Sequence, residues 1–164
     1  LESVQQIVEL LGLEPHPEGG YFRRTYTSNT IAPIGLKQAN QPTLTCIYYL
    51  LTSDSPIGHL HVNQSDIVHF FHGGSPITYT LVSPKGELET VTLGADVKAG
   101  QKLQLTVRGG CWKTSQLMEG DYGLISEAVS PGFVFQDMAF VSKADIASRF
   151  PTLGESLNRF VKAN

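Results

Sequence analysis

GHLHVNQSDIVHFFHGG, residues 58–74, is the stretch that decides the fold of this 164-residue chain. It holds four of the chain's five histidines, beginning with His59 and His61, and a carboxylate follows at Asp66. Side chains two residues apart point to the same face of a β-strand, so His59 and His61 project together if this stretch is extended. Two imidazoles beside a carboxylate can hold a divalent first-row metal, or they can act as an acid–base cluster near neutral pH.

The spacing within this stretch resembles the first motif of the cupin superfamily, in which His-x-His is followed by an acid and a glycine. Those positions are His59, His61, Asp66 and Gly73. Four longer segments are similar to one uncharacterised cupin family, the DUF985 (cupin_5) proteins, and they run in order through nearly the whole chain: HPEGGYFRRTYTS, QSDIVHFFHGG, VRGGCWKTSQL and GDYGLISEAVSPGFVFQD. The resemblance implies an all-β cupin (RmlC-like) double-stranded β-helix, or jelly-roll barrel. It implies no particular reaction, because cupins host many functions.

Short strands separated by turn signals make up most of the remaining chain. β-Branched and aromatic residues over 43–52 predict a buried strand, and pairs such as Gly109-Gly110 mark turns. Many short strands at near-regular spacing are typical of a sandwich or barrel. We expect strands at residues 21–27, 43–52, 59–62, 66–72, 77–82, 87–93, 103–107, 111–118, 122–129 and 133–141.

Both ends of the chain are expected to be helical. Ser3 and Gln6 form a capping-box pair for a helix over residues 3–11, which Gly12 is placed to end. Helical turns are expected from residue 144, and their apolar stripe should pack on the outside of the barrel: Ile146, Phe150, Leu153, Leu157 and Phe160. Residues 28–41 are expected to form a loop, and without a linker we expect one domain over residues 1–164.

A low charge density and a small negative net charge exclude several function classes. Charged residues make up 16% of the chain, against about 25% in a typical domain. The net charge of -3 gives no electrostatic footprint for nucleic acid or for an anionic membrane. No apolar run approaches the roughly 20 residues that cross a bilayer, and no signal-peptide pattern is visible. Cys46 and Cys111 are interpreted as free thiols of a cytoplasmic protein.

A metal site is one interpretation of the histidine motif. The resemblance implies that metal-binding cupins supply three histidines and an acid, with the last histidine in a second motif, but Lys113 stands at that position here. A protonated lysine repels a cation and is not a ligand. The remaining donors, His59, His61 and Asp66, would hold Zn, Fe, Mn or Ni in an oxygenase or isomerase, or they would be the relic of a lost site. The resemblance to DUF985 counts against metal, because that family reliably keeps only the position of His61.

The alternative is a metal-free pocket that binds a small polar molecule, either sugar-like or carboxylated. A barrel of about eight strands can hold one such ligand. If Asp66 points inward, strand alternation brings Phe70 and His72 into the pocket and turns His69 outward. Lys113 would then line the same pocket. Either Arg23 or Arg24, with Arg24 as the candidate, would bind an anionic group at its mouth or form a salt bridge with Glu18 or another neighbour.

Such a pocket could belong to an isomerase or epimerase. The resemblance to cupin sugar-nucleotide epimerases implies a histidine–aspartate pair as the base and a tyrosine as the acid. His61 with Asp66, and Tyr122 or Tyr79 as the donor, could play those parts. His59 would contribute to ligand binding. The sequence leaves open whether the protein is an enzyme.

A storage or interaction protein is the third interpretation. Cupins of related families pair through their barrel sheets, and an outward stripe of Ile67 and Phe71 would suit such pairing. We therefore predict a homodimer. Phe133 and Phe135 are expected to share a strand face and fill the core, and Trp112 is expected to be a packing residue.

Overall fold

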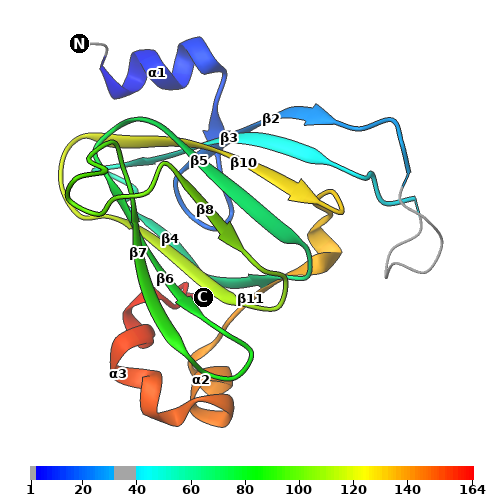
Figure 1. Cartoon of the computed structure of the whole chain (residues 1–164), viewed down its shortest axis with the longest axis vertical. Coiled ribbons are helices and arrows are strands. Elements are labelled where there is room, and N and C mark those ends of the chain that lie inside the picture. Colours follow the sequence, from blue (N-terminus) through cyan, green and yellow to red (C-terminus); the bar gives the residue numbers. More distant parts are fainter. Residues whose placement is uncertain (1–2, 32–39) are drawn as a thin grey trace.

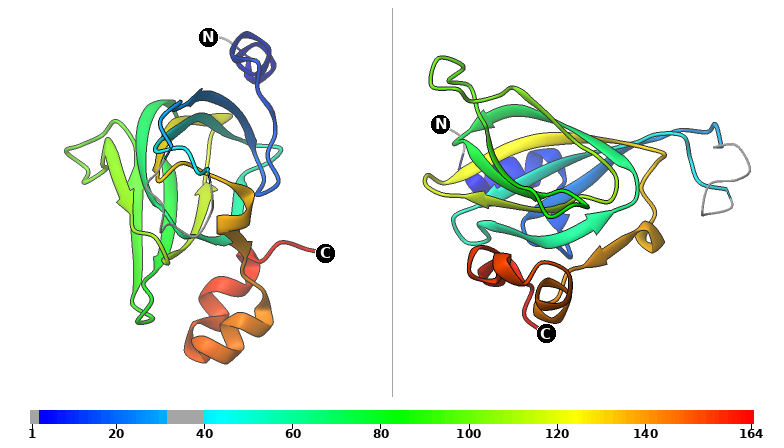
Figure 2. Two further views of the ribbon diagram at one scale, coloured as in Figure 1. Left: turned by 90° about the vertical axis from the view of Figure 1, so that its right-hand side faces the viewer. Right: turned by 60° about the horizontal axis from the view of Figure 1, so that its bottom comes forward.

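The computed structural model of the chain describes residues 3–31 and 40–164, and it consists mainly of two antiparallel β-sheets that face each other (Figures 1 and 2). The six-stranded sheet has the order β1 (Glu14–Pro15), β2 (Tyr21–Thr27), β3 (Thr45–Thr52), β10 (Tyr122–Ser130), β5 (Asp66–Gly74) and β8 (Gln104–Val107). The five-stranded sheet has the order β11 (Met138–Phe140), β4 (Ile57–Asn63), β9 (Trp112–Leu117), β6 (Ile77–Val82) and β7 (Leu88–Leu93).

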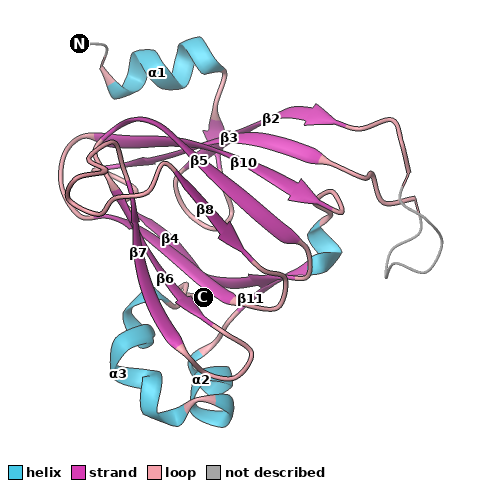
Figure 3. Ribbon diagram, in the orientation of Figure 1, coloured by secondary structure: helices cyan, strands magenta, loops and turns pink. Residues whose placement is uncertain are grey.

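Both sheets contribute to the hydrophobic core between them. Leu51 and Ile125 of the six-stranded sheet meet Ile77 and Leu93 of the five-stranded sheet, and all four side chains are fully buried. Within the described ranges no hydrogen-bonded ladder joins the two sheets, so the barrel is not closed. The mainly β architecture that the sequence predicted is confirmed (Figure 3).

Nine of the ten expected strands form close to their predicted positions, and the tenth is wrong in most of its length. The segment predicted as a strand over 133–141 instead contains a 3-10 turn, η1 (Phe135–Asp137), before the short strand β11. The Gln41 side-chain amide fixes this turn, because its Nε2 donates to Gly132 O at 2.9 Å and to Asp137 Oδ2 at 2.7 Å. Phe135 is 57% exposed as a result and does not fill the core. The loop predicted over 28–41 lies partly outside the described residues.

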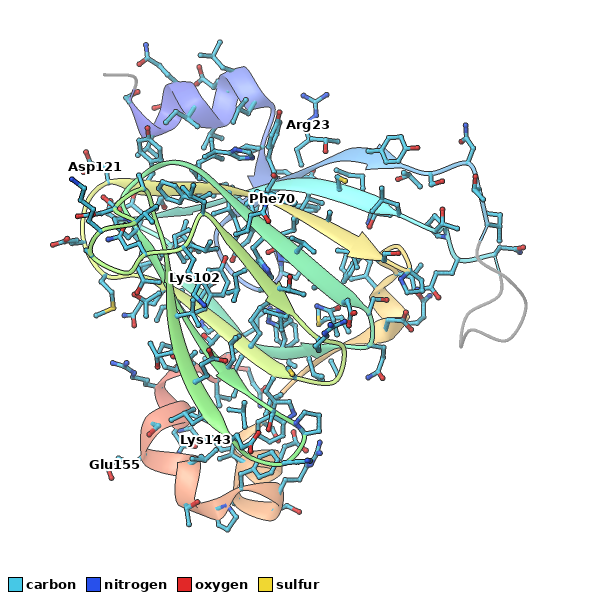
Figure 4. All side chains as sticks on the ribbon, viewed as in Figure 1. Arg23, Phe70, Lys102, Asp121, Lys143 and Glu155 are labelled. Carbon is cyan, nitrogen blue, oxygen red and sulfur yellow. The ribbon has the colours of Figure 1, made fainter. Side chains whose placement is uncertain are left out.

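Strand β5 presents the face opposite to the one expected from an inward Asp66. Ile67 and His69 are buried, at 2% and 0% exposure, whereas His72 is exposed and Phe70, labelled in Figure 4, is half-buried. The reason is that Asp66 binds partners at the surface, and the two-residue period of a strand then reverses every following side chain. The outward apolar stripe proposed for pairing is therefore absent, and the homodimer stays a prediction without that argument.

The N-terminal helix α1 (Val4–Leu11) lies on the outer side of the six-stranded sheet (Figure 1). Its predicted capping box is present, since Ser3 Oγ accepts from Gln6 N–H and the Gln6 side chain accepts from Ser3 N–H. Gly12 ends the helix in a left-handed conformation. Ile7 anchors the helix by packing against the buried Leu50 of β3.

The C-terminal helical segments cover the outer side of the five-stranded sheet (Figure 2). They are α2 (Lys143–Arg149), η2 (Pro151–Leu153), α3 (Gly154–Leu157) and η3 (Asn158–Phe160). Their predicted apolar stripe packs against Trp112, Leu60 and Val82, which confirms Trp112 as a packing residue. None of the helices in the described part of the chain is long and apolar enough to cross a membrane.

Candidate functional site

A pocket with a cavity volume of about 50 Å³ opens at one end of the space between the sheets, and about 520 Å³ of space lies in and around it when the open solvent at its mouth is included. Its polar lining consists of His16, Glu18, Arg24, Asn63 and Glu127. Its apolar and aromatic lining consists of Phe22, Ile47, Tyr49, Ile67, Val129, Phe133 and Phe135. Figure 4 shows how densely side chains fill the remaining interior. The shape and mixed lining are those of a small-molecule site.

Strand register arranges one row of side chains across the inner face of the six-stranded sheet. Arg24 on β2 pairs with Ile47 on β3, Ile47 pairs with Glu127 on β10, and Glu127 pairs with His69 on β5. Glu127 faces inward because it alternates with Ile125, which is fully buried. The row therefore runs from a cation at the pocket mouth, across an apolar residue, to an anion and an imidazole inside.

A buried cluster joins the two sheets at the inner end of this row. His69 Nδ1 lies 3.1 Å from Leu105 O, and because a carbonyl only accepts, Nδ1 carries the hydrogen of the neutral ring. His69 Nε2 can then accept from Lys113 Nζ at 2.8 Å. The Lys113 ammonium is 3.7 Å from Glu127 Oε1. Lys113 belongs to β9, so this contact crosses from the five-stranded sheet to the six-stranded sheet.

Electrostatics fix the charges of this cluster. Burial would raise the pKa of Glu127, but the Lys113 ammonium and His69 outweigh burial and hold that pKa well below its usual range. Burial, followed by the neighbouring Lys113, lowers the pKa of His69. The cluster thus places an ionised Glu127 beside Lys113 and a neutral His69, whose Nε2 lies 3.4 Å from Glu127 Oε1.

The second polar group is the pair formed by Glu18, which lines the pocket, and His61, which lines a smaller adjoining hollow. His61 Nδ1 donates to His59 O at 2.7 Å, which leaves Nε2 without a hydrogen in the neutral ring. That Nε2 is buried, has no hydrogen-bond partner, and lies 3.3 Å from Glu18 Oε1. A carboxyl group and a free imidazole lone pair therefore face each other across one small gap.

The pKa values of this pair are displaced in opposite directions. Burial raises the pKa of Glu18 to about 7, from an ordinary value of 4.5. Burial, followed by the nearby Lys113, lowers the pKa of His61 to about 3. Both displacements favour a neutral acid beside a neutral imidazole over an ion pair, although the 3.3 Å separation would suit either. Near pH 7 Glu18 is close to half-protonated, which suits a group that both gives and takes protons.

The backbone around Glu18 is held by several hydrogen bonds. Glu18 O accepts from His59 N–H at 2.7 Å and from His59 Nδ1–H at 2.8 Å. Tyr49 donates through its hydroxyl to Gly19 O at 2.8 Å. Gly19 has a φ of 104°, and a Cβ there would collide with Ile57 O, so only glycine fits. His59 thus positions the loop that carries Glu18.

His16 completes the wall beside Glu18. Its Nδ1 accepts from the Glu18 backbone N–H at 3.0 Å and lies 3.9 Å from Glu18 Oε2. Burial lowers the pKa of His16 despite the attraction of Glu18. The ring packs edge-on against Phe22 and Tyr49, with centroid separations of 4.6 and 5.6 Å. His16 is therefore a neutral, firmly packed neighbour of the titratable carboxyl.

Several residues predicted for the site lie elsewhere. Asp66 accepts from Arg108 Nη1 at 2.9 Å and from Gly109 N–H at 2.8 Å, and its side chain is 44% exposed. These two donors, with the backbone donor first, lower its pKa. His72 binds Ser126 Oγ at 2.7 Å on the outer side of the sheet. Phe70 shares that outer face, so neither residue points between the sheets.

The two candidate tyrosines also separate. Tyr122 packs half-buried with the cluster beneath α1, outside the pocket. Tyr79 is 1% exposed inside the barrel, and its ring lies edge-on to His69 with centroids 5.0 Å apart. The Tyr79 hydroxyl has no hydrogen-bond partner, and burial, followed by Glu127, raises its pKa well above the usual value. Of the predicted residues, His61 and Lys113 come together as cross-strand partners, and Arg24 lines the pocket.

The donors expected to bind a metal do not fit one. In residues 3–31 and 40–164 no three or more His, Cys, Asp or Glu side chains are grouped to hold an ion. His59 uses Nδ1 on the Glu18 carbonyl, Asp66 binds Arg108, and the Lys113 ammonium is the cross-strand neighbour of His61. We derive no step through a metal.

The sequence reasoning missed three inward-facing groups: Glu18, Glu127 and His69. A signal for Glu127 was present, since a carboxylate alternates there with the apolar Ile125 and Val129 on one strand face. His69 was assigned to the wrong face because Asp66 was assumed to point inward. Glu18 lies in a loop, where no periodic pattern reports burial.

Comparisons with known proteins agree with the fold. The family model described as Cupin superfamily (DUF985) matches residues 5–141. A Saccharomyces cerevisiae protein described as uncharacterized protein YML079W is 41% identical, with 87% of this chain and 77% of that protein covered.

Solved structures give the same result. A hypothetical protein from Leishmania major has a TM-score of 0.91 at 28% identity, covering 99% of this chain and all of its own. Shewanella oneidensis protein SO0799 has a TM-score of 0.89 at 29% identity, with both chains fully covered. Oxalate decarboxylase from Bacillus subtilis, at a TM-score of 0.58 and 17% identity, covers 92% of this chain and 38% of its own, which supports the fold alone. The chain therefore belongs to the DUF985 (Cupin_5) family of the cupin superfamily.

Proposed function

We propose that this protein binds a small molecule between its sheets and moves protons on that molecule without a metal, as isomerases and epimerases do. One observation carries the proposal. The Glu18 carboxyl, with a pKa of about 7, lies 3.3 Å from the unpartnered Nε2 of His61 and lines the pocket. The sequence predicted Asp66 and His61 as the acid–base pair. In this proposal Glu18 replaces Asp66 in that pair, and His61 remains a member of it.

The two pocket carboxyls have different roles because their surroundings push their pKa values apart. Glu127 stays ionised beside Lys113 and can accept a hydrogen bond from the ligand. Glu18 changes protonation near neutral pH and is the group that transfers the proton.

The reaction that fits is proton transfer at a carbon next to a carbonyl group. The Glu18 carboxylate takes the proton, and the electron pair of the C–H bond moves toward the carbonyl oxygen. Glu18 then returns the proton on the same side of the ligand to a neighbouring atom, as in an isomerisation, so no atom or electron is gained or lost. The proton stays on Glu18 in the interval, because the pKa of His61 is only about 3, and the neutral His61 Nε2 can accept a hydrogen bond from the protonated carboxyl.

The first test measures the pKa of Glu18. A pH titration is monitored by carbon-13 NMR of protein labelled at its glutamate carboxyl carbons. We expect one resonance to titrate near pH 7 and to disappear in Glu18→Gln. Glu155→Gln, at an exposed position on α3 (Figure 4), is the matched control and should leave that resonance in place. If every glutamate titrates near its ordinary value, Glu18 is not the proton-transfer group.

The second test is exchange of carbon-bound protons in D2O, measured by proton NMR on a panel of keto acids, hydroxy acids and sugars. We expect exchange in at least one compound, lost in Glu18→Gln and retained in Glu155→Gln and in the presence of EDTA. Exchange that requires an added divalent metal would replace this proposal with the metal-dependent alternative. Exchange that survives in Glu18→Gln would remove Glu18 from the mechanism.

A further inference from the structure

We infer that the ligand of this pocket is a small carboxylate with an apolar, ring-sized body and a hydroxyl or carbonyl group at its opposite end, and that Arg24 binds its carboxylate at the pocket mouth. The inference rests on the proposed function for the identity of the pocket. The ligand is then carboxylated rather than sugar-like, and it lies with its carboxylate at the pocket mouth.

Within residues 3–31 and 40–164, the Arg24 guanidinium has no anionic partner. Its hydrogen bonds are long, at 3.4 Å to Thr27 Oγ1 and 3.5 Å to Phe133 O, and no carboxylate of the described residues forms an ion pair with it. Burial lowers its pKa, which means that part of its hydration is already lost. A planar carboxylate matches the fork of guanidinium N–H groups and would compensate that loss.

The middle of the pocket favours an apolar body. Ile47 separates Arg24 from Glu127 in the cross-strand row, and two strand spacings place those two backbones about 10 Å apart. Phe133 and Phe135 form an edge-to-face pair beside the mouth, with centroids 5.1 Å apart, and the Arg24 guanidinium lies 5.9 Å from the Phe133 ring. These apolar groups favour a ring over a sugar, because a ring buries more apolar surface against them.

The inner end of the pocket favours a ligand group that donates a hydrogen bond, or a reactive carbonyl group of the ligand. Asn63 Oδ1 is buried there without a hydrogen-bond partner. Asn63 also lines a smaller hollow together with His61 and Lys113, which places it at the inner end. Glu127 is a second acceptor, and Glu18 is the titratable group. A ligand hydroxyl would satisfy one of these acceptors.

Four probes separate the three features of the inferred ligand. 4-Hydroxyphenylacetate has all three: the carboxylate, the ring and the distal hydroxyl. Phenylacetate lacks the hydroxyl, and 4-hydroxyphenylacetamide lacks the negative charge. Glucose 6-phosphate is anionic and carries hydroxyls but lacks the apolar body. Binding is measured by nitrogen-15 NMR titration at millimolar concentrations. We expect the strongest saturable binding for 4-hydroxyphenylacetate, weaker binding for phenylacetate and the amide, and none for glucose 6-phosphate.

Neighbouring arginines provide a matched pair of variants. Arg24→Gln should weaken binding of 4-hydroxyphenylacetate about tenfold and leave the amide unchanged, and Arg24→Lys should restore part of the loss. Arg23→Gln is the control, because Arg23 follows the opposite strand alternation and donates to Leu11 O at 3.2 Å. Arg23→Gln should bind every probe as the native protein does.

Three results would overturn the inference: no saturable binding of 4-hydroxyphenylacetate, equal effects of Arg24→Gln and Arg23→Gln, or preferential binding of glucose 6-phosphate. None of them would change the titration of Glu18, so failure of the ligand class is distinguishable from failure of the acid–base function. A normal Glu18 titration with no probe binding would leave the proton-transfer group in place and reject this ligand.

Discussion

The two ends of the space between the sheets are stabilised differently, one by apolar packing and the other by individual polar contacts. At one end Leu51, Ile77 and Ile125 are fully buried in one apolar cluster. At the other end Glu18 and Lys113 are almost as deeply buried but depend on individual polar partners. Apolar packing tolerates substitutions that keep volume, whereas a buried charge without its partner is strongly unfavourable. Buried charged residues that cost this much free energy mark this end as the candidate functional site.

The largest effect is expected from Lys113→Met, which breaks the polar end. The substitution leaves the Glu127 carboxylate buried without its cation and removes the donor to His69 Nε2. We expect the free energy of unfolding to fall by about 3–5 kcal/mol, measured by urea denaturation. Adding Glu127→Gln to this variant should recover part of the loss. A decrease below about 1 kcal/mol would mean that the ion pair is not needed to keep Glu127 buried.

Leu51→Ala is the corresponding change at the apolar end. The side chain is fully buried, so its truncation should reduce the free energy of unfolding by about 2–5 kcal/mol. The Glu18 resonance should still titrate near pH 7, because the cavity lies in the apolar cluster and removes no polar partner. A displaced titration would show that the two ends of the space are not independent.

Glu18→Gln should change how stability depends on pH. The folded protein holds the Glu18 proton up to about pH 7, whereas the unfolded chain releases it near 4.5. The native protein therefore binds more protons between these values, and its stability falls as the pH rises through them. Glutamine cannot titrate, so the stability of the variant relative to native protein should rise by roughly 3 kcal/mol between about pH 4 and pH 8.

His61 changes the pH dependence of stability in the opposite direction to Glu18. The contribution of Glu18 must therefore be measured as the difference in free energy of unfolding between Glu18→Gln and the native protein. Its pKa falls from 6.5 to about 3 on folding, so the unfolded chain binds more protons between those values and stability rises with pH there. Between about pH 4.5 and 6.5 the two contributions oppose each other in the native protein. Urea denaturation of both proteins at each pH isolates Glu18. A flat difference would contradict its raised pKa.

Asp66→Asn should have the smallest effect and separates a surface carboxylate from the buried ones. Its ion pair with Arg108 is largely exposed, so solvent screening limits the loss to below about 1 kcal/mol. Proton exchange and the Glu18 titration should remain unchanged. Loss of exchange with retained stability would return Asp66 to the site.

The sequence predicted the apolar end far better than the polar end. Alternation and turn residues located most strands, and the Ser3 capping box located α1, because these patterns are local. The polar end combines Glu18 from a loop, His61 from one sheet and Glu127 from the other, and only the tertiary fold brings them together. The reversal of β5 arose from one assumption about Asp66, and the partner that disproves it, Arg108, is 42 residues away in the chain.

Gly19 shows how selection can act on a residue that carries no chemistry. Its backbone conformation and the nearby Ile57 carbonyl leave no room for a side chain, and its own carbonyl is held by Tyr49. Any replacement would push the neighbouring Glu18 away from His61 before it altered the rest of the barrel. In a saturation mutagenesis screen scored by activity, Gly19 should rank with the proton-transfer residues, and a screen scored by abundance alone would underestimate it.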